Sequence, residues 1–230
     1  MVNRVSGLRA GLRAGIVISA SVALAGCLGS TGGGGAGGGA GGGGGGGGAG
    51  TVSAHDARFD QLSGMVPTTD MPITGTADYA GSVKTILNEG STPIGTLLGE
   101  IEMQLDFGQA FADITAQSVT GRVHNIRGTI GDDDVTYDGE LTTAAAGAPS
   151  TMNISQTDVA GMTLTTGAIM ANFGGDLTLD GETGQANLML GGAFVGPGGQ
   201  AAHGPAAGTW WRPGGLSDFN VGGTWYAERQ

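Results

Sequence analysis

The sequence has few of the residues on which several classes of function depend. Its 230 residues include one cysteine, 5% aromatic side chains, and nine lysines and arginines against 20 aspartates and glutamates. A single cysteine excludes an intrachain disulfide, so the fold must be stable without that cross-link. The shortage of basic residues argues against nucleic acid as a partner, because phosphate binding needs clustered lysine and arginine. No nucleotide-binding loop, serine-hydrolase elbow or zinc-protease motif occurs, and we expect no enzyme, cofactor or metal.

The apolar run nearest the N-terminus is too short to cross a membrane. It extends from Ile16 to Ala25, about ten residues, whereas a membrane-spanning helix needs roughly twenty. Three arginines precede it, at positions 4, 9 and 13. A basic head followed by a short apolar run is typical of a secretory signal peptide, which we assign to residues 1–26.

The four residues Leu24-Ala25-Gly26-Cys27 resemble the lipobox of bacterial lipoproteins. In that family the thiol is alkylated with a diacylglycerol, the chain is cut before the cysteine, and the new amine is acylated. The resemblance implies lipidation of Cys27 and anchoring in the outer membrane, because Leu28 replaces the aspartate that signals inner-membrane retention. A catalytic role for Cys27 is disfavoured, since the polyglycine that follows offers no rigid frame for a base.

Residues 27–50 predict a flexible tether. The sequence from 32 to 50 is almost entirely glycine, which loses much backbone entropy on ordering and has no side chain to bury. A coil of this length has a root-mean-square reach of about 25 Å. Loss of the signal peptide would leave six basic residues against 20 acidic ones, a net charge of −14. Such a chain is repelled by anionic lipid, so acyl chains alone would hold it at the membrane.

The remaining chain predicts an irregular lead-in at 51–72, with a short helical turn from His55 to Leu62, and one β domain at 73–230. The clearest strand runs from Thr96 to Phe107, where apolar and polar residues alternate with a period of two. Turn chemistry is expected at Gly131–Asp134 and from Asp180 to Gly184, and loops at 142–149 and 196–207. Strands are expected at 75–81, 96–107, 111–119, 123–130, 135–141, 152–157, 162–170, 175–179, 185–195, 208–212 and 221–227.

These short strands and the absence of a convincing long helix indicate an all-β fold, a single antiparallel β-barrel of about eight strands. Glycines within strands, such as Gly128, Gly139 and Gly175, are typical of bulges and sharp corners. A transmembrane barrel is the rival architecture. It would need an unbroken apolar outer band, but the polar face of the clearest strand carries Glu100 and Glu102.

Four stretches resemble the β-barrel domain of transferrin-binding protein B and related surface lipoproteins, over roughly residues 73–230. They are Gly75 to Gly81, Leu105-Asp106-Phe107-Gly108, Gly192-Ala193-Phe194-Val195-Gly196-Pro197, and Val221 to Arg229. The sequence departs from the family between Gly198 and Gly208, which is longer and has no glutamate. It also has room for one barrel and none for the handle domain that carries transferrin recognition. The resemblance therefore implies the fold and a surface location, but not transferrin as the ligand.

Few side chains are candidates for a site. Trp210 and Trp211 are adjacent, so one is expected to fill the barrel and the other to face outward, where it could touch a ligand. His203 is a third candidate ligand contact. His124 and the acidic run Asp132–Asp134 are interpreted as a sheet residue and a solvated turn, with a metal site as the alternative.

Two functions remain open at this point. The first is an outer-membrane surface lipoprotein whose barrel binds a nutrient carrier or a host protein, of the iron or haem acquisition type that the resemblance implies. The second is a structural or envelope-assembly lipoprotein with no soluble ligand. An exposed apolar patch on the loops would favour the first, and uniformly polar loops the second. A surface or a periplasmic position is possible for either.

Overall fold

The computed structural model describes residues 50–211 and 219–230. Cys27, the signal peptide assigned to residues 1–26 and the tether at 27–49 lie outside the described residues. The described chain forms the following elements, in order: α1 Val52–Ser63, β1 Thr76–Glu89, β2 Thr92–Asp106, α2 Phe107–Ala112, β3 Val119–Ile130, β4 Asp133–Gly139, β5 Leu141–Thr142, β6 Thr151–Val159, β7 Met162–Leu179, β8 Glu182–Val195, the 3-10 turn η1 Pro197–Gly199, β9 Ala201–Trp210 and β10 Phe219–Arg229.

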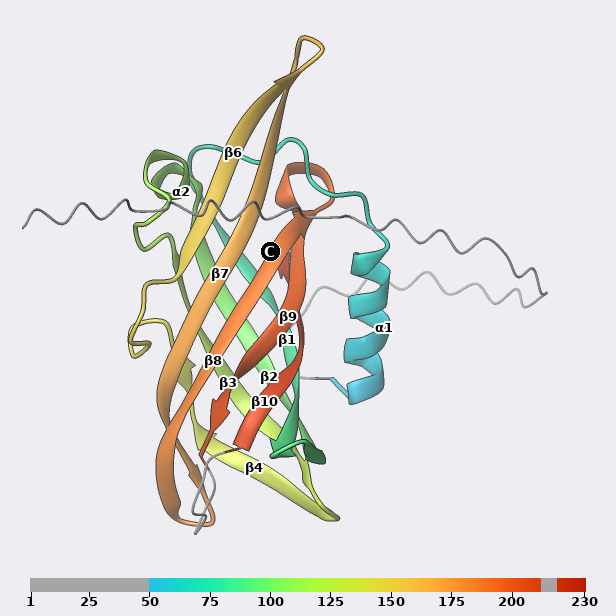
Figure 1. Ribbon diagram of the computed structural model, residues 1–230, viewed down its shortest axis with the longest axis vertical. Helices are drawn as coiled ribbons and strands as arrows, with labels where there is room; N and C mark the ends of the chain where they lie inside the picture. The colour runs from blue at the N-terminus through green and yellow to red at the C-terminus, as the bar shows by residue number, and fades with distance from the viewer. Residues whose placement is uncertain (1–49, 212–218) are drawn as a thin grey trace, which may run out of the picture. The chain divides into compact units, whose positions relative to one another are not determined.

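All strands belong to one antiparallel sheet of ten strands, eight of which close into a ring. The ring order is β1, β2, β3, β4, β7, β8, β9 and β10, and pairing of β10 with β1 completes it. β5 continues β4 after Gly139, whose φ of 110° marks the break. β6 pairs with β7 beyond the ring (Figure 1). The predicted all-β class and the antiparallel barrel of about eight strands are confirmed.

Periodicity places the side chains of β2 as expected. Leu97, Ile101, Met103 and Leu105 are buried in the barrel. Glu100 departs from the expected solvated face, because it is only 8% exposed on the outer wall. The hairpin predicted around Asp-Gly is also present.

Two-residue turns join several of these strands. Asp180 and Gly181 link β7 to β8 with φ values of 54° and 83°, and such a pair of positive angles suits the right-handed twist of the strands. The predicted acidic turn is shorter than expected, because Asp133 and Asp134 already belong to β4.

Two element predictions are wrong. The strand expected at 111–119 is replaced by α2 and a loop, because the Asp106 side chain accepts a hydrogen bond from the Gln109 amide and caps a helix there. The loop expected at 196–207 is replaced by η1 and β9. Its alanines and glycines resemble a loop in composition, but β9 runs so close to β8 that a Cβ at Gly204 would collide with the Gly191 carbonyl oxygen.

The lead-in is more ordered than the sequence predicts. α1 is a 12-residue helix that begins at its N-cap Thr51 and packs on the outer wall of β9, β10 and β1. Residues 64–75, which we call the strap, then cross one end of the barrel. There Met71 is buried in the core and its amide donates to the Thr165 carbonyl. Neither helix of the described residues is long and apolar enough to cross a membrane.

The two ends of the barrel differ. At one end, the hairpin end, lie the strap, α2 and the β6–β7 hairpin, which projects beyond the rim (Figure 1). At the other, the turn end, lie the short turns between β1 and β2, β3 and β4, and β7 and β8. α1 runs along the wall toward the hairpin end. Residues in the loops of the hairpin end are therefore separated by the length of the barrel from residues in the turns of the turn end.

Candidate functional site

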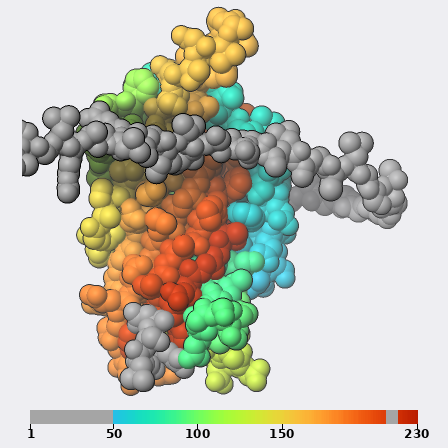
Figure 2. All heavy atoms as spheres, viewed as in Figure 1, coloured from blue at the N-terminus to red at the C-terminus, as the bar shows by residue number. Residues whose placement is uncertain are grey.

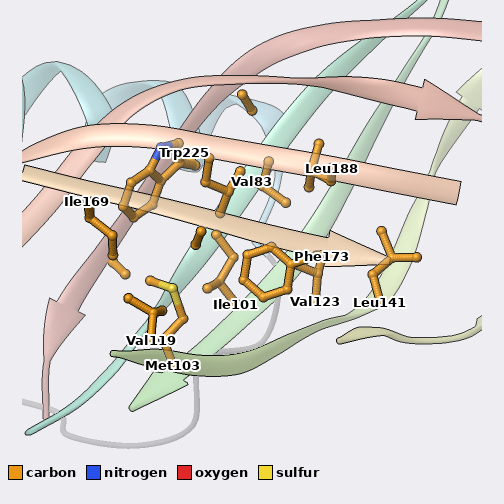
Figure 3. Close-up of a cluster of buried hydrophobic side chains, with 14 of the residues drawn as sticks. Val83, Ile101, Met103, Val119, Val123, Leu141, Ile169, Phe173, Leu188 and Trp225 are labelled. Carbon is orange, nitrogen blue, oxygen red and sulfur yellow. The ribbon is translucent and has the colours of Figure 1, made fainter. Parts of the chain in front are cut away.

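The middle of the barrel is filled by its own side chains. Figure 3 shows residues from β1, β2, β3, β7, β8 and β10 converging there, among them Ile101, Phe173 and Trp225. Trp225 is fully buried, and its indole N–H donates to the Gly191 carbonyl at 2.9 Å. An eight-stranded barrel is just wide enough for such packing. A partner of this barrel must therefore bind at an end or on the outer wall.

One ring of the tryptophan pair fills the barrel, as expected, and the other packs against the core. Trp210 is 1% exposed and its ring meets Tyr137 edge to face, with 6.0 Å between centroids. Trp211 is half-buried and lies against Gly184 of β8, where a Cβ would collide with its ring. Trp211 therefore covers a strand, and whether it touches a ligand stays a prediction.

His203 is not in a loop, because it lies on β9 under helix α1. Its ring meets Phe59 of α1 edge to face at 5.4 Å, and its Nδ1 lies 3.5 Å from the Ser63 hydroxyl. Burial lowers the pKa of His203. The side chain serves the docking of α1 in this structure, which leaves contact with a ligand a prediction only.

α1 is docked through a second histidine that the sequence does not single out. His55 is 2% exposed, with Nδ1 2.6 Å from the Ser82 hydroxyl and Nε2 3.0 Å from the Thr224 hydroxyl. Burial first, and then the charge of Lys84, lower its pKa to about 4, against an opposing effect of Asp56. The imidazole is therefore neutral near pH 7 and bridges two strands of the barrel.

A serine beside a histidine invites comparison with a catalytic pair, but this pair is unsuited to catalysis. Ser82 is 5% exposed and lies beneath α1, so a substrate has no access to its hydroxyl. The second imidazole nitrogen meets the Thr224 hydroxyl instead of a carboxylate. A base with a pKa near 4 is also poorly matched to neutral pH. The two contacts of His55 hold α1 against β1 and β10.

A polar cluster occupies the outer wall of β2 and β3. Arg122 donates to Glu102 and Glu140, and the Asn125 amide donates to Glu100 at 3.0 Å. The imidazole of His124 lies 3.6 Å from Glu102. Within residues 50–211 and 219–230, no three histidine, cysteine or acidic side chains converge as metal ligands. We interpret the cluster as a salt-bridged wall of the sheet.

The hairpin end gathers the exposed apolar side chains. Nine large apolar side chains are exposed among the described residues, and five of them lie on the strap, on α2 and the loop after it, or beside the hairpin turn. These five are Val66 of the strap, Phe111 of α2, Ile114 after it, and Val159 and Met162 beside the hairpin turn. Figure 2 shows the hairpin standing clear of the neighbouring atoms. These side chains come from three separate elements of the same end, so a partner that covers this end would contact several apolar groups at once.

The hairpin also carries a free sheet edge. Val159 and Met162 close a two-residue turn, so hydrogen-bonded pairs with β7 alternate along β6 and the amides of Gln156 and Asp158 point away from β7. The same alternation directs the Met152 amide away from β7, and it donates to the Ser118 hydroxyl. β6 contains no lysine, proline or bulge, which are the usual protections of an edge.

The charge at the hairpin end is mainly negative. Asp70 lies on the strap and Asp158 on β6. Asp106 ends β2 and caps α2, and Asp113 follows α2. Hydrogen bonds from Thr115 lower the pKa of Asp113, so it stays ionised. One basic side chain lies beside α2, where the Arg229 guanidinium is 5.9 Å from the centre of the Phe107 ring. The end thus combines exposed apolar side chains with several carboxylates.

No protein-family model matches the chain, and no curated protein sequence matches it either.

Proposed function

We propose that the protein is a lipid-anchored binding module of the bacterial outer membrane, whose hairpin end contacts a protein partner such as a nutrient carrier or a host protein. One observation carries the proposal, namely that five of the nine exposed large apolar side chains of the described residues belong to this end. Because side chains fill the middle of the barrel, no space remains there for a carried ligand. The lipid anchor at Cys27 and the tether remain part of the proposal.

The position of α1 supports this use of the hairpin end. The chain enters the described part at the start of α1, and α1 then runs along the wall toward the hairpin end (Figure 1). The tether therefore joins the barrel at the beginning of α1, away from the exposed tip of the hairpin. A partner can reach the tip without meeting the point of attachment.

Membership of the transferrin-binding protein B type is part of the proposal, and the family-like stretches meet in space. Tyr79 pairs with Arg229 across β1 and β10, and its ring meets Phe194 at 6.1 Å. The Phe107 amide donates to the Gly75 carbonyl, which joins the stretch at 105–108 to the stretch at 75–81. Four segments that are far apart in sequence thus form one unit at the hairpin end.

The chemistry of the end indicates the kind of partner. Exposed apolar side chains and aspartates favour a protein surface that presents both apolar and basic groups. The free edge of β6 offers backbone hydrogen bonds to an extended segment of that partner. An acidic partner or a nucleic acid would be repelled.

A structural role in the envelope is the second candidate, and one observation favours it. From Thr183 to Trp211 the sequence has no aspartate, glutamate, lysine or arginine. This stretch supplies β8 and β9, whose outer wall includes exposed Met189, Pro205 and Ala207. An uncharged wall on an acidic protein suits close packing in an assembly.

The proposal is tested on intact cells. Protease is added to cells that carry the protein with a C-terminal tag, and a Cys27→Ala variant serves as the control for anchoring. We expect loss of the tag from intact cells and release of the variant from the membrane. A tag that survives until the outer membrane is opened would place the domain in the periplasm and would favour the structural role.

A second measurement locates the contact. A photo-crosslinking amino acid is introduced at Met162 in the hairpin, and in a matched variant at Ser91 in the turn at the opposite end. We expect a covalent adduct with another polypeptide from Met162 only. Adducts from both positions, or from neither, would contradict binding through the hairpin end.

A further inference from the structure

The barrel mouth at the turn end contains a pocket of about 560 Å³. Its lining comes from β2, β3, β4, β7, the turn after β7, and β10, and it includes the apolar residues Ile130, Leu179 and Phe219. These elements meet at the end opposite to the β6–β7 hairpin (Figure 1). The volume lies in the range that encloses a small organic molecule.

The pocket also has acidic residues. Asp133 and Asp134 come from the start of β4, and Asp180 from the turn between β7 and β8. Among the described residues, none that lines the pocket is a lysine or an arginine. Carboxylates around an apolar hollow create a negative potential that attracts cations and repels anions.

Two polar groups without hydrogen-bond partners are buried in the barrel behind the pocket lining, one on the residue after Thr136 and one on the residue that pairs with Phe219. They are the hydroxyl of Tyr137 and the indole N–H of Trp210, whose residues are 2% and 1% exposed. Burial first, and then the charge of Asp180, raise the pKa of Tyr137 to about 12. Buried polar groups in native proteins nearly always have a partner, so their presence points to a missing one.

We propose that this mouth binds a small organic cation that carries an ammonium group at one end and a hydroxyl or carbonyl group at the other. The ammonium group lies among Asp133, Asp134 and Asp180. The apolar body packs against the aliphatic and aromatic wall. The polar group at the inner end pairs with the Tyr137 hydroxyl and the Trp210 indole N–H.

An organic cation fits this pocket better than a metal ion. In the part of the chain that the structure describes, no three acidic, histidine or cysteine side chains are close enough to hold a metal together. An ammonium group needs no such convergence, because a diffuse negative potential and single hydrogen bonds suffice. The apolar wall would also give a hydrated metal no stabilisation.

Tyramine is the probe, because it joins an ammonium group to a phenol through an apolar body. Phenethylamine is the matched ligand without the hydroxyl. Binding is measured by calorimetry on the full chain with Cys27→Ala. We expect tyramine to bind, and phenethylamine to bind about tenfold more weakly, since it leaves the inner polar groups unpaired.

Two variants test the ends of the pocket separately. Asp180→Asn should weaken both ligands about fivefold or more through loss of charge, and asparagine tolerates the same positive φ in the turn. Asp158→Asn, in the hairpin at the other end, is its control and should leave binding unchanged. Tyr137→Phe should raise the melting temperature of the free chain and should make the two ligands bind equally.

Three results would overturn the proposal. They are absence of tyramine binding at millimolar concentration, equal effects of the two aspartate variants, and a preference for tyramine that survives Tyr137→Phe. A rise in melting temperature alone would show only that the hydroxyl is unpaired. This experiment is independent of binding at the hairpin end, because neither the ligand nor the variants at the mouth involve that surface.

Discussion

The imidazole of His55 is enclosed where a positive charge is poorly accommodated. Its two nitrogens meet the hydroxyls of Ser82 and Thr224, and the ammonium group of Lys84, which pairs with Asp56, lowers its pKa further. Arg58 of α1 forms an ion pair with Glu228 of β10, which also holds the helix on the barrel. The neutral ring therefore stabilises the docked helix and the charged ring destabilises it.

This side chain predicts a loss of stability in mild acid. The pKa of His55 is about 4 in the folded chain and about 6.5 in the unfolded chain, so the unfolded state binds the proton more readily. The contribution is fully present above about pH 6.5 and is lost as the pH falls toward 4, by a total of about 3 kcal/mol. Urea unfolding at pH 7.5, 6 and 5 measures it, with the Cys27→Ala chain.

The control for this prediction is His55→Gln, which keeps a neutral hydrogen-bonding side chain. The two proteins should differ in the slope of unfolding free energy against pH between 6.5 and 4, with the steeper loss in the parent. Carboxylates titrate in both and cancel in the comparison. Parallel slopes would show that His55 does not titrate as described.

At the level of single residues, burial can be predicted from the sequence but long-range contact partners cannot. The burial of one of the adjacent residues Trp210 and Trp211 follows from the alternation of side chains along any strand. The partners of His55 do not, because Ser82 and Thr224 are 27 and 169 residues away along the chain. The same holds for the pocket at the turn end. Its aspartates belong to two separate turns of the sequence, and they come together only when the barrel closes. Only closure of the ring brings such residues together.

Among the strands, β10 shows how glycine permits close approach. Gly222 and Gly223 are neighbours on opposite faces of this strand. A Cβ at Gly223 would collide with the Lys84 carbonyl of β1, whereas a Cβ at Gly222 meets nothing within 4 Å. The two positions separate the effect of space from the effect of losing a glycine.

Alanine at these two positions should give opposite results. Gly223→Ala should lower the free energy of unfolding by about 1–3 kcal/mol, because a backbone carbonyl must move. Gly222→Ala should be neutral or slightly stabilising, because alanine restricts the unfolded chain. Thermal and urea unfolding of both variants are compared with the parent. Equal losses in both would mean that the strands are not in this close register.

The residue pattern of each strand explains why some strands can be predicted from the sequence and others cannot. β2 is found because large apolar residues alternate with charged ones, so that each face is marked. β9 is missed because alanine, glycine and Pro205 mark neither face, although the neighbouring strands require small residues there. α2 is missed because its capping by Asp106 depends on where β2 ends. Strong alternation is readable from sequence, whereas close approach of strands is not.

At the scale of the whole molecule, charge is the property that the sequence shows most directly. The ion pairs on the described surface, Arg58–Glu228, Lys84–Asp56 and those of Arg122, are all at least partly exposed. Exposed pairs contribute little to stability, typically below about 1 kcal/mol each. The uncompensated carboxylates repel one another over longer distances, so self-repulsion should outweigh the pairs.

Added salt should therefore stabilise the protein at neutral pH. Raising sodium chloride from 0.01 to 0.5 M shortens the Debye length from about 30 Å to a few ångströms, which screens the repulsion among the carboxylates. The melting temperature of the His55→Gln chain should rise by a few degrees at pH 7, which corresponds to about 1 kcal/mol for a domain of this size. The His55→Gln background removes the histidine effect from the comparison. Near pH 4.4, the isoelectric point of the sequence, the net charge vanishes and the rise should disappear. A fall in melting temperature with salt at pH 7 would mean that the exposed ion pairs outweigh the repulsion.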